Sequence, residues 1–159
     1  MDRYIPFVLI PLIAWGVRFH LKKRNNYTPL KRITLRIALA AYLMTELGRS
    51  FYRPFIYHNH IDDWFIADTL GNSFGTITAI FMVLTLSASE SQKDWKIVVL
   101  IISGLLGYEL LNLTGRTAID VNDLIATFIF GSLAAAVYFF LLKKYGRNNI
   151  QSGGNPEFR

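Results

Sequence analysis

The hydrophobic residues of the chain fall into five long runs separated by short polar segments. The runs cover residues 4–21, 33–47, 64–86, 97–113 and 123–142. An α-helix needs roughly 20 apolar residues to cross a bilayer, so the shorter second run must extend into Arg49 and Arg53. An outer loop is expected from Pro54 to Asp63. Gly104 and Gly107 are expected to let helices approach closely. The pattern predicts an all-α protein, a polytopic transmembrane helix bundle of about five spans.

Loop charge predicts how this bundle is oriented. Residues 20–32 form the densest positive segment, which the positive-inside bias places in the cytoplasm. Five spans then put the N-terminus outside and the C-terminus in the cytoplasm. The other interpretation of this segment is a patch that binds anionic lipid or phosphate. We expect residues 1–147 to form the bundle and residues 148–159 to form a polar, disordered tail.

Two parts of the chain share a spacing of charged and small residues. In both parts a Glu precedes an Arg by seven positions, and a later Asp precedes a Gly by eight. The pairs are Glu46–Arg53 and Asp63–Gly71 in one part, and Glu109–Arg116 and Asp123–Gly131 in the other. A small residue follows four positions after each of the two glycines. We predict a duplicated helix–turn–helix, with repeat one at about 33–86 and repeat two at about 97–142. Chance similarity between apolar segments is the alternative.

Ionisable residues within or beside the apolar runs indicate a site. Charge in hydrocarbon costs at least ~2.5 kcal/mol unless it is paired or meets water. Both repeat turns fall on the predicted outer side. They bring together Glu46, Arg49, Arg53, Asp63 and Asp68 from the first copy, and Glu109, Arg116, Asp120 and Asp123 from the second. Arginine binds phosphate or carboxylate through two parallel donors, whereas acids accept hydrogen bonds from hydroxyls and amines. A purely structural alternative has the Glu and Arg side chains neutralise each other, with Asp63 and Asp123 capping helices.

The composition narrows the class of protein. The 159 residues are 52% hydrophobic and 14% aromatic, and a soluble domain of this size would be less apolar. The absence of cysteine excludes disulfides and thiolate chemistry. The net charge is +6, and the basic residues cluster beside the apolar runs, which fits binding to a membrane surface better than binding to nucleic acid. The expected partners are membrane lipids or lipid-linked glycans, with a membrane protein partner or a second copy also open.

Catalytic motifs are sparse. His58 and His60, followed by acids, are weak candidates for a metal site, because the one other histidine, His20, falls on the opposite predicted side. The sequence holds no phosphate-binding glycine loop and no nucleophile elbow, and we expect no cofactor. Acid–base catalysis by Glu46 and Glu109 is conceivable, since burial raises a carboxyl pKa. A membrane enzyme acting on a lipid-linked substrate and a structural subunit of an assembly therefore stay open.

The last two runs carry a family resemblance. The segment E-L-L-N-L-T-G-R-T-A-I-D-V-N-D-L-I-A-T-F-I-F-G-S-L resembles the signature of the VanZ-like membrane family, which has Glu-x-x-Gln, then Arg, then Asp, then a helix with Asn and Gly. The matching positions are Glu109, Asn112, Arg116, Asp123, Thr127 and Gly131, with Asn112 in place of Gln and Thr127 in place of Asn. The resemblance implies a bacterial inner-membrane protein of the cell envelope, in some members linked to resistance against teicoplanin-type antibiotics. We therefore expect a polar or anionic lipid or glycolipid headgroup as the ligand of the outer-face cluster.

Overall fold

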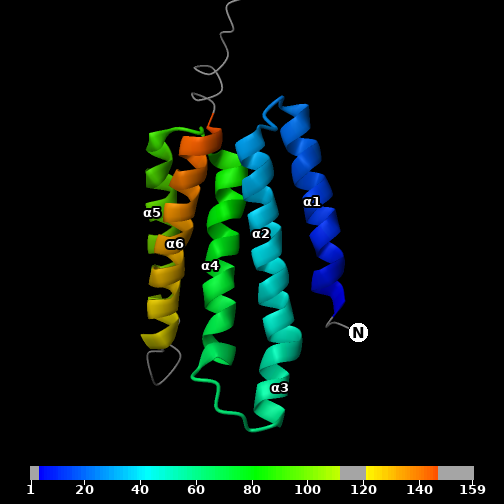
Figure 1. The fold of residues 1–159 in the computed structure, drawn as a ribbon, viewed down its shortest axis with the longest axis vertical. Coiled ribbons are helices and arrows are strands. Elements are labelled where there is room, and N and C mark those ends of the chain that lie inside the picture. The colour runs from blue at the N-terminus through cyan, green and yellow to red at the C-terminus, as the bar shows by residue number, and fades with distance from the viewer. Residues whose placement is uncertain (1–3, 112–120, 147–159) are drawn as a thin grey trace, which may run out of the picture.

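The chain folds into a bundle of helices that run alternately up and down (Figure 1). The computed structural model describes residues 4–111 and 121–146, and these contain helices and no strand. The long helices are α1 (Ile5–Lys23), α2 (Pro29–Leu47), α4 (Ile66–Ser87), α5 (Trp95–Leu111) and α6 (Val121–Tyr145). A short 3₁₀ turn, η3 (Gln92–Asp94), precedes α5. The predicted all-α class is confirmed.

The second helix is longer than predicted. A π-helical turn, η2 (Gly48–Tyr52), and the short helix α3 (Arg53–His58) follow α2 without a break. The expectation of a loop from Pro54 onward is therefore wrong as far as His58. Pro54 is the second residue of α3 and directly follows the π-helical turn, after which the Arg53 amide bonds the Gly48 carbonyl five residues back. Proline lacks an amide and interrupts the regular hydrogen bonds of an α-helix, which fits its place beside this turn.

Within the described ranges, three helices are long and apolar enough to cross a membrane, namely α1, α4 and α6. Large apolar side chains also face outward around the bundle, including Trp15, Leu100 and Phe140. Such a surface is unfavourable in water and suits lipid, so the structure indicates a membrane protein. Because α5 has 17 described residues and α2 begins with a basic stretch, the predicted fourth and fifth crossings stay predictions.

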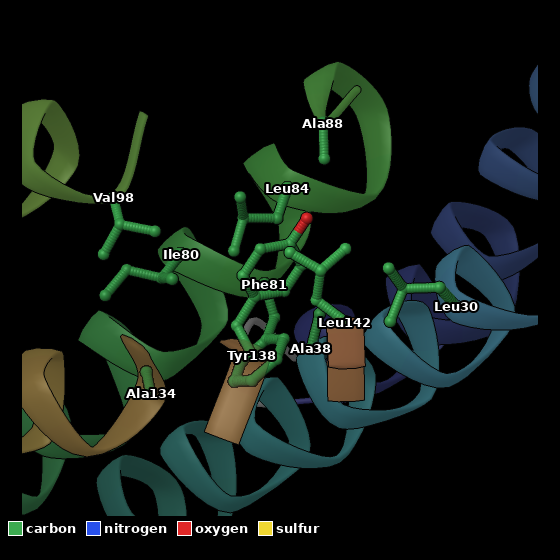
Figure 2. Close-up of a cluster of buried hydrophobic side chains, with 10 residues drawn as sticks. All are labelled: Leu30, Ala38, Ile80, Phe81, Leu84, Ala88, Val98, Ala134, Tyr138 and Leu142. Atoms are coloured by element: carbon green, nitrogen blue, oxygen red, sulfur yellow. The ribbon is translucent and has the colours of Figure 1, made fainter. Parts of the chain in front are cut away.

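The core lies around α4, which packs against α2, α5 and α6. The core side chains come from these four helices and from Ala88, the residue after α4. They are shown in Figure 2: Leu30, Ala38, Ile80, Phe81, Leu84, Ala88, Val98, Ala134, Tyr138 and Leu142. The helix α1 packs mainly on α2 at the edge. The expectation that Gly104 and Gly107 make close helix contacts is wrong, because a Cβ at either position would meet nothing within 4 Å.

The bundle has two ends of different character. The basic end holds the loop at residues 24–28, the loop at residues 88–94 and residues 143–146, which lie together in Figure 1. The cavity end holds η2 and α3 and the start of α4 and of α6. The predicted tail at residues 148–159 lies outside the described residues.

A buried carboxylate organises the basic end. Asp94 accepts hydrogen bonds from the Ser89 amide at 3.0 Å, the Ser89 hydroxyl at 2.8 Å, the Ser91 amide at 3.1 Å and the Tyr138 hydroxyl at 2.6 Å. Burial alone would raise the pKa of Asp94, but the hydrogen bonds from Tyr138, Ser89 and Ser91 outweigh it and lower that pKa below its ordinary value. The loop before α5 is thereby tied to α6.

Candidate functional site

A cavity of about 460 Å³ opens at the cavity end. Ligand sites in proteins typically measure about 300–1,000 Å³. The lining comes from α2, η2, α3, α4 and α6: Thr45, Gly48, Arg49, Arg53, Ala67, Asp68, Gly71, Asn72, Gly75 and Asp123. Polar and charged side chains thus converge between helices whose other faces are apolar.

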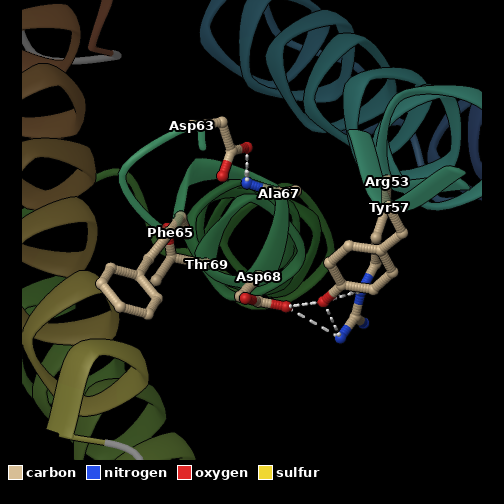
Figure 3. Close-up of polar contacts among 7 residues, drawn as sticks. All are labelled: Arg53, Tyr57, Asp63, Phe65, Ala67, Asp68 and Thr69. Atoms are coloured by element: carbon tan, nitrogen blue, oxygen red, sulfur yellow. Dashed lines mark hydrogen bonds and ion pairs between the residues drawn. The ribbon is translucent and has the colours of Figure 1, made fainter. Parts of the chain in front are cut away.

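One wall of the cavity is an ion pair supported by a phenol (Figure 3). Arg53 Nη2 lies 2.9 Å from Asp68 Oδ1, which also accepts the hydroxyl of Tyr57. The Tyr57 oxygen in turn accepts from Arg53 Nε at 3.2 Å and Nη2 at 3.1 Å. Asp68 was predicted to need a partner or water because it lies one turn inside an apolar helix, and the structure supplies both an arginine and a cavity.

The second arginine is held much less firmly. Arg49 Nη1 lies 4.0 Å from Glu46 Oε1, at the limit of an ion pair, and the Arg49 side chain is 68% exposed. Glu46 itself is buried, with 10% of its side chain exposed. A pair at this distance, with one largely exposed partner, contributes little to stability. The Arg49 guanidinium can therefore turn toward an anion in the cavity at low cost.

The start of α4 is fixed by an acid. Asp63 Oδ2 accepts the backbone amide of Ala67 at 2.7 Å, which satisfies one of the unpaired donors of the first turn (Figure 3). Trp64 and Phe65 adopt left-handed φ angles of 58° and 64°, so the chain turns sharply just before the helix. Phe65 is the N-cap residue of α4, and Asp63, two positions before it, supplies the side-chain acceptor for the first turn. By holding this turn, Asp63 positions Ala67 and Asp68 at the cavity wall.

Glycines keep the cavity open. Gly71 and Gly75 line it, and a Cβ added to either would meet nothing within 4 Å. Gly48 has a different role, since a Cβ there would lie 2.2 Å from Leu70 Cδ2. Gly48 thus lets η2 approach α4, while Gly71 and Gly75 leave space that larger side chains would occupy.

The structure brings part of the predicted cluster together. Arg49, Arg53, Asp68 and Asp123 line the cavity, and Glu46 and Asp63 lie directly behind this lining. Asp123 stands in the first turn of α6, inside the helix rather than at its cap.

The rest of the predicted cluster is not in the cavity lining. Glu109 is half-buried near the end of α5 and does not line the cavity. Arg116 and Asp120 lie outside the described residues.

The two histidines do not form a metal centre with other described residues. His58 ends α3 and His60 follows it, and both side chains are exposed. Within the described ranges, no group of three or more His, Asp or Glu side chains is placed to hold a metal ion. Neither Glu46 nor Glu109 is in the cavity lining, so the described geometry does not bring these two carboxylates together for acid–base chemistry.

Sequence reasoning missed the neutral members of the site. Tyr57 was assigned to a loop, although it follows Arg53 by four positions and so shares its helix face. Asn72 follows Asp68 by four positions and precedes Gly75 by three, which places all three on one face of α4. The sequence signal that could have identified this wall is a face of polar and small residues within an apolar helix.

The cavity can accommodate a charged polar group. Among the described residues, Arg53 Nη1 has no hydrogen-bond partner, and Arg49 is only weakly paired, so donors of both side chains can reach an anion. Asp68 and the Asn72 amide, both on α4, add acceptors to the cavity lining. Searches of protein-family models, of curated proteins and of solved structures each found no match to the chain.

Proposed function

We propose that this chain is a VanZ-like envelope membrane protein that binds the polar or anionic headgroup of a lipid or glycolipid. The observation that carries the proposal is the cavity at one end of an apolar bundle, lined by Arg49, Arg53, Asp68 and Asp123. Apolar bundles tolerate such charges where they meet a cavity, a partner or a substrate. A headgroup would reach this cavity from the adjoining lipid without leaving the membrane surface.

The chemistry of the lining favours a ligand with an anionic group. Arg49 offers a largely exposed guanidinium, and its contact with Glu46 at 4.0 Å is readily replaced. Arg53 keeps its contacts with Tyr57 and Asp68 through Nε and Nη2, and its Nη1 group can donate to a ligand. Charge-assisted hydrogen bonds to a phosphate or carboxylate are stronger than neutral ones, particularly where the site excludes water.

The setting of the protein belongs to the same proposal. We place it in a bacterial inner membrane as a multi-pass protein of about five spans, with the cavity end outside and the basic end in the cytoplasm. The two helix pairs α2–α4 and α5–α6 would be the copies of a duplicated helix–turn–helix. The role we favour is protection of the cell envelope, including resistance to antibiotics that act there.

The test is native mass spectrometry of the protein released from gentle detergent. The wild-type chain should retain a discrete lipid or glycolipid adduct. Gly75→Leu should lose it, because the new side chain fills the cavity without changing any charge. Gly104→Leu is the matched control, since it adds the same side chain to α5 away from the cavity, at a glycine that also has open space.

Two results would contradict the proposal. One is a wild-type protein without any lipid adduct, or with a metal ion instead, which would favour the enzyme alternative. The other is an adduct that survives Gly75→Leu as well as it survives Gly104→Leu. Thermal unfolding of both variants would show that each is folded when the spectra are recorded.

A further inference from the structure

A second polar depression lies at the basic end and has no part in the proposed function. Its volume is about 310 Å³, and it is lined by one stretch of chain: Tyr27, Thr28, Pro29, Arg32, Ile33 and Arg36. The first turns of α2 and the loop before it form the whole lining. Two arginines, a phenol and apolar side chains therefore meet in one place.

The two arginines share a face of α2. Arg32 and Arg36 are four positions apart, so their side chains are neighbours on the helix surface. Neither forms a salt bridge with a carboxylate among the described residues, and the first turn of α2 contains no acid. Like charges at this spacing repel each other. An anion between the two guanidinium groups would relieve that repulsion.

The two acids nearest this depression, Glu90 and Asp94, are both buried. Glu90 is buried, and one of its oxygens accepts the hydroxyl of Thr28. Asp94 is buried and accepts hydrogen bonds from the Ser89 and Ser91 segment and from Tyr138. Thr28 lines the depression, so Glu90 lies beside it, but among the described residues neither carboxylate forms a salt bridge with Arg32 or Arg36. They do not neutralise the arginine face, which is exposed to the surroundings.

The position of this arginine face favours a lipid headgroup as the source of the anion. Leu30, Thr34 and Ala38 point into the bundle, so Arg32 and Arg36 point away from it on the opposite side of α2. Arg36 lies about 10 Å along the helix from its start, at ~1.5 Å per residue. In a membrane protein this is the depth of headgroups and of the first acyl carbons, and long basic side chains reach back to the headgroups there.

We propose that Arg32 and Arg36 form a binding site for the phosphate of an anionic phospholipid at the basic end of the bundle. The planar fork of arginine fits a phosphate, and the Tyr27 hydroxyl can supply a further donor. Ile33 and Pro29 provide an apolar surface for the start of the acyl chains. The site is independent of the cavity at the other end, so either proposal can fail without the other.

The experiment uses the delipidated full chain carrying Gly75→Leu, so that binding in the filled cavity is not counted. Phosphatidylglycerol is added in detergent, and the bound fraction is read by native mass spectrometry. Arg32→Gln/Arg36→Gln should bind it at least about tenfold more weakly, because charge-assisted hydrogen bonds from both arginines are lost. Lys22→Gln/Lys23→Gln is the matched control, since it removes the same charge from exposed residues at the same end.

Four outcomes would overturn this site. Equal binding by the arginine variant and the control would show that lipid binds without these side chains. Equal loss in both would show that only total charge matters. Displacement of the bound phosphatidylglycerol by inorganic phosphate, at the concentrations where the lipid binds, would identify a soluble anion as the ligand. Zwitterionic phosphatidylcholine should bind the parent chain weakly, and equal binding would also count against an anionic site.

Discussion

The two ends of the bundle use polar side chains in opposite ways. At the basic end, Asp94 is 2% exposed and accepts four hydrogen bonds from groups in the same fold. At the cavity end, the Arg53 and Asp68 side chains are 48% and 34% exposed beside an open cavity. The first arrangement satisfies its charge internally. The second leaves donors and acceptors facing a space that another molecule can enter.

This difference separates structural from binding roles within one apolar bundle. A buried carboxylate with all its partners in place is costly to disturb, because removing it leaves several donors unsatisfied. An exposed ion pair contributes little to folding, because solvent screens it and its side chains lose entropy when ordered. Under the proposed function, the charges at this exposed position serve a ligand rather than stability.

Replacing the buried carboxylate should have the largest effect on folding. Asp94→Ala should lower the free energy of unfolding by about 3 kcal/mol, because the donors of Ser89, Ser91 and Tyr138 lose their acceptor. Asp68→Ala at the cavity end should cost less than about 1 kcal/mol. Denaturation of both variants in the same detergent measures the difference. Equal losses would show that the two ends do not differ in the way described.

Removing a single donor should have a smaller effect. Tyr138→Phe deletes the hydroxyl that lies 2.6 Å from Asp94 and keeps the ring in the core. A hydrogen bond to a charged group contributes about 1.5–3 kcal/mol, so stability should fall by about that amount. The matched variant Tyr57→Phe at the cavity end should change the denaturation midpoint much less. A larger loss for Tyr57→Phe would reverse the comparison.

Acid should weaken the basic end selectively. The pKa of Asp94 lies below its ordinary value of 3.8 in the folded state, so the unfolded chain binds more protons between the two values. This carboxylate therefore stabilises the fold fully above that ordinary value and loses its contribution as pH falls through the folded pKa. Unfolding followed from neutral pH to below pH 4 should show a smaller acid-induced loss for Asp94→Asn than for wild type. Parallel curves would contradict the role given to Asp94.

The smallest effect on stability is expected for the exposed arginine. Arg49→Gln should change the free energy of unfolding by less than about 0.5 kcal/mol, since its contact with Glu46 is long and the Arg49 side chain is 68% exposed. Thermal unfolding beside Arg18→Gln, an exposed arginine on α1, gives the reference for a lost charge. A loss of several kcal/mol would mean that Arg49 is a structural residue.

The sequence predicted the helices well where long apolar runs define them. α4, for example, begins two residues after the predicted start at Trp64 and ends one residue after the predicted end at Leu86. Asp68 was also identified correctly as a residue in need of partners, because an acid inside an apolar helix has few other options. The extension through α3 was missed because Pro54 was taken as the start of a loop.

The basic-end network could not have been predicted from local pattern. Asp94 lies in a short segment of mixed charge that resembles an ordinary solvated loop. Its burial depends on Tyr138, 44 residues further along the chain. The neutral lining of the cavity was missed for a related reason, since Tyr57 gains its role only when α3 and α4 are brought together.

The most direct test of the contrast between the two ends is the headgroup adduct of Arg49→Gln in native mass spectra, compared with that of Arg18→Gln. If the cavity binds an anionic headgroup, Arg49→Gln should lose most of the adduct while its unfolding stays within about 0.5 kcal/mol of wild type. Arg18→Gln should keep the adduct. Retention of the adduct by Arg49→Gln at the level of Arg18→Gln would contradict the binding role assigned to the cavity end.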